Sequence, residues 1–321
     1  MALECGFARV GIASAGPAPK AQGLGDWLAK GWHGEMAYMA ENLPKRLDPS
    51  LLVPGARSVI CLVASYACQG DGLVARFARG RDYHTVLKKR CHSLMDRIRA
   101  AAPGFEGRAF VDSAPVMERS LAVMAGIGWI GRNGCLFSPG LGSYVLLCEI
   151  VCDLDLCVDS PVASGCDGCG QCVRACPTGA LGDSGLVDCR RCVSYLTIEH
   201  RGEIAPELWP LMGEGVFGCD CCQAVCPHNA GLGAGDVELT APSAVSTLNV
   251  GRLLAWRQED WDLATRGSAV RRAKYEMLVR NAMIAAGNGG KGMHLAQALK
   301  AVAAAQGDLA ALAFWAASRC N

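Results

Sequence analysis

Long hydrophobic runs are missing from this chain of 321 residues, although 51% of its residues are hydrophobic. No apolar run reaches the roughly 18 residues expected of a membrane-spanning helix, and no charged-then-apolar signal peptide opens the chain. A dominant charge is missing too, because the formal net charge is only +1. That value gives no general attraction to nucleic acid, so a nucleic-acid partner would need a local basic patch. Composition therefore predicts a cytoplasmic protein without a membrane partner.

Cysteine is the residue that the chain has in excess, with 19 in 321 residues. An odd number does not suit a secreted disulfide framework, and abundant thiols indicate a reducing cytoplasm. Several isolated cysteines are expected to be small buried apolar residues. These are Cys5, Cys61, Cys91, Cys148 and Cys320. Cys135, in a glycine-rich loop, is instead a candidate for the lining of a pocket.

Two runs of cysteine near the middle of the chain have the spacing of iron–sulfur ligands. They read Cys166-x-x-Cys169-x-x-Cys172-x-x-x-Cys176-Pro177 and Cys219-Asp220-Cys221-Cys222-x-x-x-Cys226-Pro227. The first is the bacterial ferredoxin pattern, whose fourth cysteine ligates the other of two clusters. A zinc site needs only four ligands, usually from two Cys-x-x-Cys pairs. We therefore predict two 4Fe–4S clusters, with zinc or disulfides as the alternatives.

Spacing assigns one set of cluster ligands and leaves the other open. In the ferredoxin topology the first three cysteines of one run join the last cysteine of the other. Cluster one then takes Cys166, Cys169, Cys172 and Cys226. Cluster two takes Cys176 and three more from Cys189, Cys192, Cys219, Cys221 and Cys222. Cys219-x-x-Cys222 has the usual geometry for two ligands of one cluster, so the third is Cys189 or Cys192.

Residues 1–155 are predicted to form an α/β domain. The apolar runs at 58–64 and 144–150 indicate buried strands, and helical periodicity extends over 83–101. A second helix is predicted over 115–125, after a start signal and before a glycine. The glycine-rich loop that follows, over 126–134, is not a dinucleotide-binding fingerprint, because its glycines follow a helix instead of leading from a strand into one.

The rest of the chain divides into a cysteine-rich part and a helical part. Residues 156–235 are predicted to form a ferredoxin-like domain that ends in a glycine-rich linker at 231–235. Residues 236–321 are predicted to be helical, over 268–286, 293–305 and 309–318. These helices indicate one or two HEAT-type units, too few to stand alone. The predicted fold class is therefore a multidomain α/β and α+β chain with a short HEAT-like C-terminal part.

Several strings in the N-terminal domain and in the cysteine-rich part carry a resemblance to a known family. They are HGEM at 33–36, GRDYH at 80–84, VDSAPVMER at 111–119, AGIGWIGRN at 125–133, CVSYLTIE at 192–199 and GCDCCQAVCP at 218–227. Together these strings closely resemble the epoxyqueuosine reductases, from about residue 5 to about residue 290. That family uses cobalamin and two 4Fe–4S clusters to make queuosine at the anticodon wobble position of tRNA. The resemblance implies a tRNA bearing epoxyqueuosine as the partner.

The resemblance also implies roles for single residues. It selects Cys192, Cys219 and Cys222 as the partners of Cys176 in cluster two. It makes Asp112 the proton donor, although an Asp just before a helix that starts with proline is usually an N-cap. An apolar corrin ring over Asp112 would raise its pKa by desolvation.

Contacts to cobalamin and to tRNA follow from the same resemblance. The cobalamin contacts would be Arg46, Leu136, Leu147, Ser194 and Asp220, beside Asp112. The alternatives are a solvated surface position for Arg46 and local turn hydrogen bonds for Ser194 and Asp220. No Asp-x-His-x-x-Gly string is present, so a base-off cob(II)alamin is expected. The tRNA contacts would be Arg201, Arg271 and Lys274, with solvated charges as the alternative.

The activity implied is the reductive removal of an epoxide oxygen by a monomer that takes electrons from a low-potential donor. Electrons would pass from cluster one to cluster two and then to the cobalt, and Asp112 would protonate the leaving oxygen. One alternative is a corrinoid reductase of a small molecule, akin to the reductive dehalogenases. Another is a ferredoxin-like electron carrier, which would leave residues 106–150 without a purpose.

Overall fold

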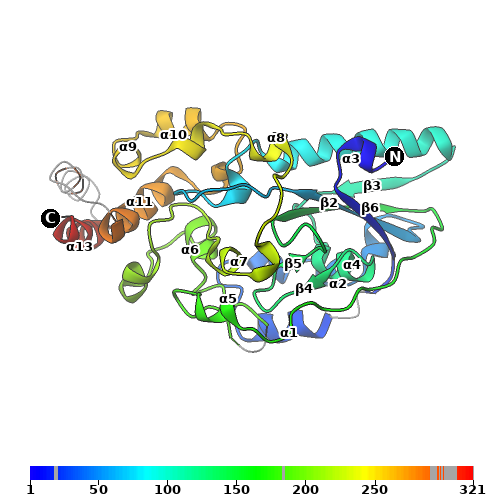
Figure 1. Ribbon diagram of the computed structural model, residues 1–321, viewed down its shortest axis with the longest axis horizontal. Coiled ribbons are helices and arrows are strands. Elements are labelled where there is room, and N and C mark those ends of the chain that lie inside the picture. Colours follow the sequence, from blue (N-terminus) through cyan, green and yellow to red (C-terminus); the bar gives the residue numbers. More distant parts are fainter. Residues whose placement is uncertain are drawn as a thin grey trace.

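The computed structural model describes residues 1–17, 21–182, 185–289, 295, 297, 299 and 309–320. In Figure 1 a β-sheet lies at one end of the elongated molecule and the C-terminal helices lie at the other. The short helices of the cysteine-rich segment lie between these two ends. The first and third predicted parts of the chain therefore flank the second.

A sheet in the order β1-β2-β6-β3 forms the first part. Its strands are β1 (Arg9–Ser14), β2 (Ser58–Ser65), β3 (Gly107–Phe110) and β6 (Val145–Cys152). Both predicted strands are confirmed, and all neighbouring strands run antiparallel. Seven of the eight residues of β2 are buried because helices cover both faces of the sheet. The mixed α and β content is confirmed, with antiparallel pairing throughout the sheet.

Helices α3 (Tyr83–Ala101) and α4 (Glu118–Met124) pack on opposite faces of the sheet. The bounds of α3 match the prediction, whereas α4 begins three residues later than predicted. The glycine-rich loop contains a small hairpin of β4 (Trp129–Ile130) and β5 (Leu136–Phe137). A Cβ on Gly128 would lie 1.8 Å from the carbonyl oxygen of Phe137, so the hairpin closes only over glycine.

Short elements complete the first part and form most of the second. The first part also has η1 (Leu3–Cys5), α1 (Ala21–Ala29), η2 (Ala37–Met39), α2 (Leu43–Leu47), η3 (Pro49–Leu52) and η4 (Arg76–Ala78). The cysteine-rich part has α5 (Gln171–Arg174), α6 (Val193–Ile198), η5 (Pro206–Leu211), α7 (Cys221–Ala224) and η6 (Pro227–Asn229). Helices α5 and α7 are each four residues long and are each soon followed by a Cys-Pro pair. Proline cannot continue a helix, so the chain turns away after each cysteine run.

The predicted glycine-rich linker at 231–235 is fixed to the sheet domain at its end. The N–H of Gly235 donates to the carbonyl of Ala67 over 2.7 Å, and the N–H of Asp236 donates to that of Ser65 over 2.8 Å. The Asp236 carboxylate also accepts two hydrogen bonds from Arg90 of α3. This end of the linker therefore runs beside the end of β2.

Helices follow the linker to the C-terminus. They are α8 (Val237–Thr240), η7 (Ala244–Thr247), α9 (Val250–Leu254), α10 (Gln258–Thr265), η8 (Ala269–Arg272), α11 (Tyr275–Gly289) and α13 (Ala310–Arg319). The prediction of one helix over 268–286 is wrong, because Ala273 is extended and separates η8 from α11. The Ser268 hydroxyl caps the first of these turns by accepting from Val270 N–H. The helix predicted over 309–318 is confirmed. The one predicted over 293–305 lies outside the described residues except for 295, 297 and 299, which are helical.

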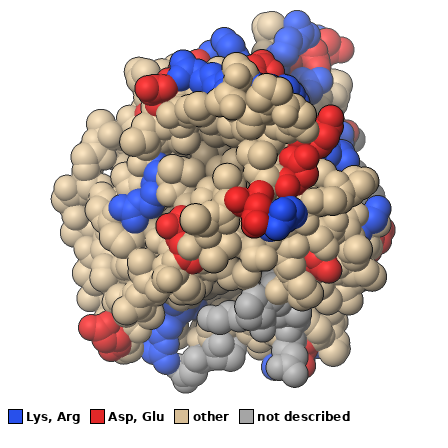
Figure 2. All heavy atoms as spheres, turned by 90° about the vertical axis from the view of Figure 1, so that its right-hand side faces the viewer, with Lys and Arg blue, Asp and Glu red and all other residues tan. Residues whose placement is uncertain are grey.

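Surface charge is sparse at the sheet end of the molecule. Figure 2 shows this end, where other side chains cover most of the area and Lys and Arg gather along the top, where α3 lies. Within the described ranges, no helix combines the length and the apolar character needed to cross a bilayer.

Candidate active site

One group of cysteines surrounds a hollow of about 290 Å³. Its lining includes the predicted ligands of cluster one, which are Cys166, Cys169, Cys172 and Cys226. Trp129 and Phe137 of the hairpin and His228 close the hollow, with the rings of Trp129 and His228 5.3 Å apart. Burial raises the pKa of the Cys172 and Cys226 thiols, and the neighbouring thiols of the group add to that effect. Residues from both cysteine runs thus meet at one place.

A second group brings Cys192, Cys219 and Cys222 within electrostatic range of one another, and Cys176 within range of Cys192. These four are the predicted ligands of cluster two. Burial raises the pKa of Cys192, against an opposing effect from the N–H groups of Ser194 and Tyr195 at the start of α6. The helix start therefore stabilises a thiolate at this position.

The two alternative ligands lie beside this second group. Burial raises the pKa of Cys189 to about 12, and the neighbouring Cys192 adds to that effect. The exposed Cys221 shares a hydrogen bond with Cys219, which lowers the pKa of Cys221 to about 7. All 19 cysteines are free thiols. In the part of the chain that the structure describes, no three His, Cys, Asp or Glu side chains are close enough to hold a single metal ion.

Cys135 of the hairpin loop joins the second group through a hydrogen bond with Cys222. The expectation that Cys135 faces a functional pocket gains support from this contact. Arg119 of α4 donates to the carbonyl of Gly134, next to this thiol. Helix α4 is therefore linked directly to the loop that reaches the second cysteine group.

Asp112 precedes α4 in the chain and is hydrogen-bonded to the first residue of that helix. Its backbone is in the left-handed region, with φ +46°. Its N–H donates to Oε1 of Glu118 over 2.8 Å, and its Oδ2 accepts a hydrogen bond from the Tyr83 hydroxyl. His84 Nε2 lies 3.8 Å from the same oxygen. The Asp112 side chain is 58% exposed, so its carboxyl group is open to a ligand.

The N-cap interpretation of Asp112 is wrong. The residue that caps α4 is Met117, which makes no side-chain hydrogen bond to the helix. The segment from Ser113 to Val116 turns before the helix begins, so Asp112 is too far from the first turn to cap it. Burial and the charge of Asp112 raise the pKa of the Tyr83 hydroxyl, which therefore stays a hydrogen-bond donor.

Tyr38, Glu199 and Arg272 form a group that was not predicted as part of the site, and Tyr38 lies within electrostatic range of Asp112. Arg272 donates from Nε and Nη2 to the two carboxylate oxygens of Glu199, over 2.8 and 2.7 Å. Its guanidinium lies 5.9 Å from the ring centroid of Tyr38. Burial raises the pKa of Tyr38, and the charges of Glu199 and Asp112 contribute. Glu199 ends one of the quoted strings, and Arg272 follows Arg271, but their pairing depends on tertiary structure.

Arg46 is buried, with 7% of its surface exposed, so the interpretation as a solvated arginine is wrong. Its Nη2 donates to the Tyr38 carbonyl over 3.1 Å, whereas Nε has no partner among the described residues. Burial lowers the pKa of this guanidinium. Leu136 is buried in β5, and Leu147 is half-buried in β6 on the same core face. Ser194 is half-buried in the first turn of α6.

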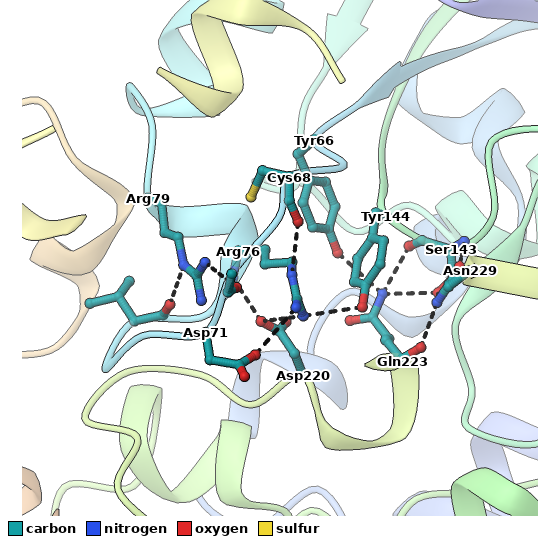
Figure 3. Close-up of polar contacts among 12 residues, drawn as sticks. Tyr66, Cys68, Asp71, Arg76, Arg79, Ser143, Tyr144, Asp220, Gln223 and Asn229 are labelled. Carbon is teal, nitrogen blue, oxygen red and sulfur yellow. Dashed lines mark hydrogen bonds and ion pairs between the residues drawn. The ribbon is translucent and has the colours of Figure 1, made fainter. Parts of the chain in front are cut away.

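Asp220 binds Arg76 instead of making a local turn. In Figure 3 its carboxylate faces Arg76, whose backbone N–H donates to Oδ2 over 2.9 Å and whose Nη1 lies 3.4 Å from it. The same Nη1 donates to the Tyr144 hydroxyl over 3.1 Å. Burial raises the pKa of Asp220, and Arg76 opposes that effect. This pair joins the second cysteine run to the sheet domain.

A neutral hydrogen-bond network beside that pair makes a second junction (Figure 3). Gln223 of α7 donates to the carbonyl and the hydroxyl of Ser143, over 2.9 and 3.0 Å. Asn229 donates to the same hydroxyl over 2.9 Å and accepts from Ser143 N–H over 2.7 Å. Because these groups are mostly buried and satisfied, they fix the cysteine-rich segment against the loop before β6.

The three predicted tRNA contacts have different surroundings. Arg201 is exposed, and its Nη1 lies 3.4 Å from the Arg272 carbonyl oxygen. Arg271 donates to Asp262 of α10 over 2.5 Å and lies over the Trp261 ring. Lys274 is exposed. Arg201 therefore lies nearest to the Tyr38 and Arg272 side of the site, whereas Arg271 is directed toward α10.

The fold and the two cysteine groups define an iron–sulfur oxidoreductase. A model described as "4Fe-4S double cluster binding domain" matches residues 165–229, and one described as "Epoxyqueuosine reductase QueG, DUF1730" matches residues 46–113. The chain is 41% identical to the epoxyqueuosine reductase of Pseudomonas aeruginosa over 93% of its own length and 86% of that protein. The chain therefore belongs to the epoxyqueuosine reductase family.

Solved structures of that family have the same fold. A structure of an epoxyqueuosine reductase with an epoxyqueuosine-modified tRNA-Tyr stem loop gives a TM-score of 0.89 at 26% identity, covering 99% of this chain and 88% of that one. A Bacillus subtilis structure, in which the loop of the catalytic aspartate is swung out of the active site, gives 0.86 at 26% identity, covering 98% and 87%.

Proposed function

We propose that this chain reduces epoxyqueuosine to queuosine at the wobble position of tRNA. Its family membership supports this activity, and a relative of the same fold has been solved with an epoxyqueuosine-modified stem loop. One observation of this chain carries the proposal. The backbone N–H of the exposed Asp112 is tied to Glu118 at the start of α4, whose next residue, Arg119, contacts the loop that holds Cys135 against Cys222. A single short helix thus links an acid to an electron-transfer group.

In this proposal each of the three parts of the chain has its own binding role. Residues 1–155 bind cobalamin, residues 156–235 hold the clusters, and residues 236–321 are a HEAT-like part that meets tRNA. Cluster one is held by Cys166, Cys169, Cys172 and Cys226, and cluster two by Cys176, Cys192, Cys219 and Cys222. The protein works in the cytoplasm as a monomer, with a one-electron donor of low potential as its reductant.

The residues around Asp112 fit a base-off cobalamin. Buried donors without partners among the described residues include Arg46 Nε and Asn133 Nδ2. Such donors suit the amide carbonyls and the phosphate that a corrin carries. We expect Arg46 to hold a polar arm, and Leu136 and Leu147 to lie near the ring. Ser194 and Asp220 would lie where the ring approaches cluster two. When bound, cobalamin supplies a cobalt centre that accepts low-potential electrons and passes them to the substrate.

In this proposal, residues of this chain donate the proton and admit the substrate base. The substrate base leaves its stack to reach a buried site, as in other enzymes that act on nucleic-acid bases. The Tyr83 hydroxyl fixes the Asp112 carboxyl, which gives its proton to the epoxide oxygen as a carbon–oxygen bond breaks. The ring of Tyr38 and the Arg272–Glu199 pair form one wall of the entrance. The oxygen leaves as water after a second proton and two electrons have been consumed.

An anaerobic turnover assay with the Asp112→Asn variant tests the proposal. Reconstituted protein receives cobalamin, a low-potential reductant and tRNA bearing epoxyqueuosine, and mass spectrometry of the nucleosides follows the loss of one oxygen. The wild-type protein is expected to convert the base. Asp112→Asn should slow conversion by on the order of 10²-fold or more, because Asn cannot donate the proton. Cluster absorbance should not change.

The matched control is Asp96→Asn on the exposed face of α3, which should convert the base at the wild-type rate. Full conversion by Asp112→Asn would refute its role as the acid. A wild-type protein with full clusters and bound cobalamin that leaves epoxyqueuosine unchanged would refute the tRNA activity. That result would favour reduction of a small molecule instead.

A further inference from the structure

Asp112, the proposed acid, is held by two helices that pack on opposite faces of the sheet. On one side, Tyr83 at the start of α3 donates from its hydroxyl to Oδ2 of Asp112, and His84 Nε2 lies 3.8 Å from the same oxygen. On the other side, Glu118 at the start of α4 accepts the N–H of Asp112 at Oε1, over 2.8 Å. Helix α3 therefore holds the side chain of the acid, and helix α4 holds its backbone.

The backbone of Asp112 needs this support because of its conformation. Its φ of +46° lies in the left-handed region, which is uncommon for a residue that has a side chain. Such a conformation persists only where the surrounding contacts hold it. Inside the turn at 113–116, Val116 N–H donates to the Ala114 carbonyl over 2.8 Å, and that bond does not reach Asp112. The Glu118 carboxyl is the group that ties the backbone of this residue to a helix.

Helix α4 is a firm support for the Glu118 side chain. Leu121 and Ala122 of this helix are each 0% exposed and belong to the core on that face of the sheet. Ala125, which follows the helix, lies so close to β1 that a Cβ on Gly11 would be 2.0 Å from its carbonyl oxygen. Because a close-packed core resists displacement, Glu118 projects from a fixed point.

The Glu118 carboxyl serves this contact as a hydrogen-bond acceptor, for which a negative charge is not needed. Burial raises the pKa of Glu118 to about 8, the charge of Asp112 adds to that effect, and Arg119 and Arg46 oppose it. A carboxyl oxygen accepts an N–H in either protonation state, and the oxygen of a glutamine amide does the same. Gln therefore offers the same acceptor at the same distance, whereas Asp is one methylene group too short.

We propose that Glu118 is a positioning residue whose Oε1 holds the backbone of Asp112, so that the acid stays beside the Tyr83 hydroxyl and within reach of the epoxide. This inference rests on the proposed function. Without the acceptor, the Asp112 N–H loses its partner and the backbone relaxes toward a commoner conformation. The backbone dihedrals set the direction of Cβ, so the carboxyl group then leaves its place. A displacement of about 1 Å at a reacting group can cost on the order of 10²-fold in rate.

Substitutions at Glu118 in the reconstituted holoenzyme separate reach from charge. Glu118→Ala should lower kcat by on the order of 10-fold to 10²-fold, because the acceptor is gone. Glu118→Asp keeps an ionisable group without the reach and should be almost as slow. Glu118→Gln keeps the reach without the ionisable group and should restore most of the rate. Glu106→Ala, at the exposed residue before β3, is the control and should convert epoxyqueuosine at the wild-type rate. An active Glu118→Asp beside an inactive Glu118→Gln would overturn the proposal.

A second measurement does not depend on turnover. Hydrogen exchange, followed by mass spectrometry of the peptide over 111–117, should be faster in Glu118→Ala than in wild type and should return to the wild-type rate in Glu118→Gln. The peptide over β2 and the affinity for a labelled stem loop should not change in any of these variants. Equal exchange over 111–117 in wild type and Glu118→Ala would contradict the proposal. Faster exchange over β2 as well would mean a general loss of structure and would also contradict it.

The two proposals fail in different ways. A wild-type enzyme that does not convert epoxyqueuosine refutes the proposed function, whereas the exchange measurement still tests the hold of Glu118 on Asp112. An active wild-type enzyme whose Glu118→Ala variant keeps the wild-type kcat refutes only the positioning role.

Discussion

The backbone of Asp112 has an unusual left-handed conformation. A positive φ of +46° is uncommon for a residue other than glycine and costs on the order of 1 kcal/mol. The hydrogen bond from its N–H to Glu118 and the one from Tyr83 to its carboxylate offset that cost. The unusual conformation directs the carboxyl group outward, away from the start of α4. Strain at this residue therefore accompanies exposure of the acid.

Glu149 makes the stability of the protein depend on pH. Its folded pKa is raised by burial, so its contribution is fully present below about pH 4.5, where both states are protonated. As pH rises, the unfolded chain ionises while the folded one stays neutral, and stability falls by about 1.4 kcal/mol per pH unit. The fall continues until the pH passes the folded pKa.

Glu149→Gln should remove this dependence. Thermal unfolding of the anaerobic protein is followed from about pH 5.5 to about pH 8.5, a range that lies above the unfolded Glu pKa. The thermal midpoint of the variant relative to that of wild type should rise with pH. The control is Glu106→Gln, whose exposed side chain should leave the profile unchanged. A constant difference between Glu149→Gln and wild type at all pH values would contradict the buried neutral acid.

At the residue scale, the sequence singled out residues that belong to a string and did not reveal features that depend on burial. The string around Asp112 made it a candidate, and the structure places it at an exposed position. A glycine-rich loop made Cys135 a candidate, and the structure places it against Cys222. Glu149 was passed over inside the apolar run at 144–150, although a lone carboxylate in such a run was a signal of a buried acid. The depth of Arg46 could not be predicted, because neighbours distant in sequence cover it.

At the scale of elements, α11 holds α6 through a buried arginine. Arg280 has 3% exposure and donates to the carbonyls of Leu196 and His200, over 2.7 and 3.0 Å. Burial lowers its pKa to about 10. Neighbouring Asn281 donates to the carbonyl of Thr197 over 2.9 Å.

Arg280→Met should lower the free energy of unfolding by about 2–4 kcal/mol, because it leaves buried carbonyls without donors. Met has a similar length, so it keeps the packing of the methylene groups of Arg280. The thermal midpoint of the cluster-loaded protein measures the effect. Arg266→Ala, at the exposed residue that follows α10, is the control and should change little, as expected of a surface ion pair. A midpoint for Arg280→Met equal to that of Arg266→Ala would contradict the structural role.

Element boundaries followed the sequence where local signals agreed with packing. Helix α3 has an Asp82 side-chain cap and a continuous apolar face, so its bounds were predictable. The start of α4 was not, because residues 113–116 form a turn that brings Asp112 beside Tyr83. The break at Ala273 escaped prediction because Val270 and Ala273 are both fully buried and periodicity alone treats them as one helix.

At the scale of the whole molecule, polar contacts cross the predicted domain boundaries. Arg76 binds Asp220, Gln223 binds Ser143, and Arg90 binds Asp236. These side chains are at most partly exposed and come from residues far apart in the sequence. A composition shift marks where a cysteine-rich segment begins, but it says nothing about such pairs. The arrangement of the three parts therefore required the structure.

Binding of the anticodon stem loop should depend only modestly on salt. The net charge is +1, and the predicted phosphate contacts are Arg201, Arg271 and Lys274. Each contact to a single strand contributes about −0.7 to the slope of log K against log salt, so three give about −2. Arg201→Ala and Lys274→Ala should each reduce the slope by about 0.7. Arg271→Ala should reduce it less, because Asp262 already neutralises that guanidinium.

Fluorescence anisotropy with a labelled stem loop at several salt concentrations measures these slopes. Arg99→Ala is the control and should leave affinity and slope unchanged, because its charge is paired with Asp96 in the last turns of α3, at the opposite end of that helix from Tyr83. A slope steeper than about −4 would mean that twice as many cations meet the backbone. The binding surface would then extend beyond the turn at 269–274, toward the Lys and Arg side chains at the top of Figure 2, and Arg99→Ala would reduce the slope as well.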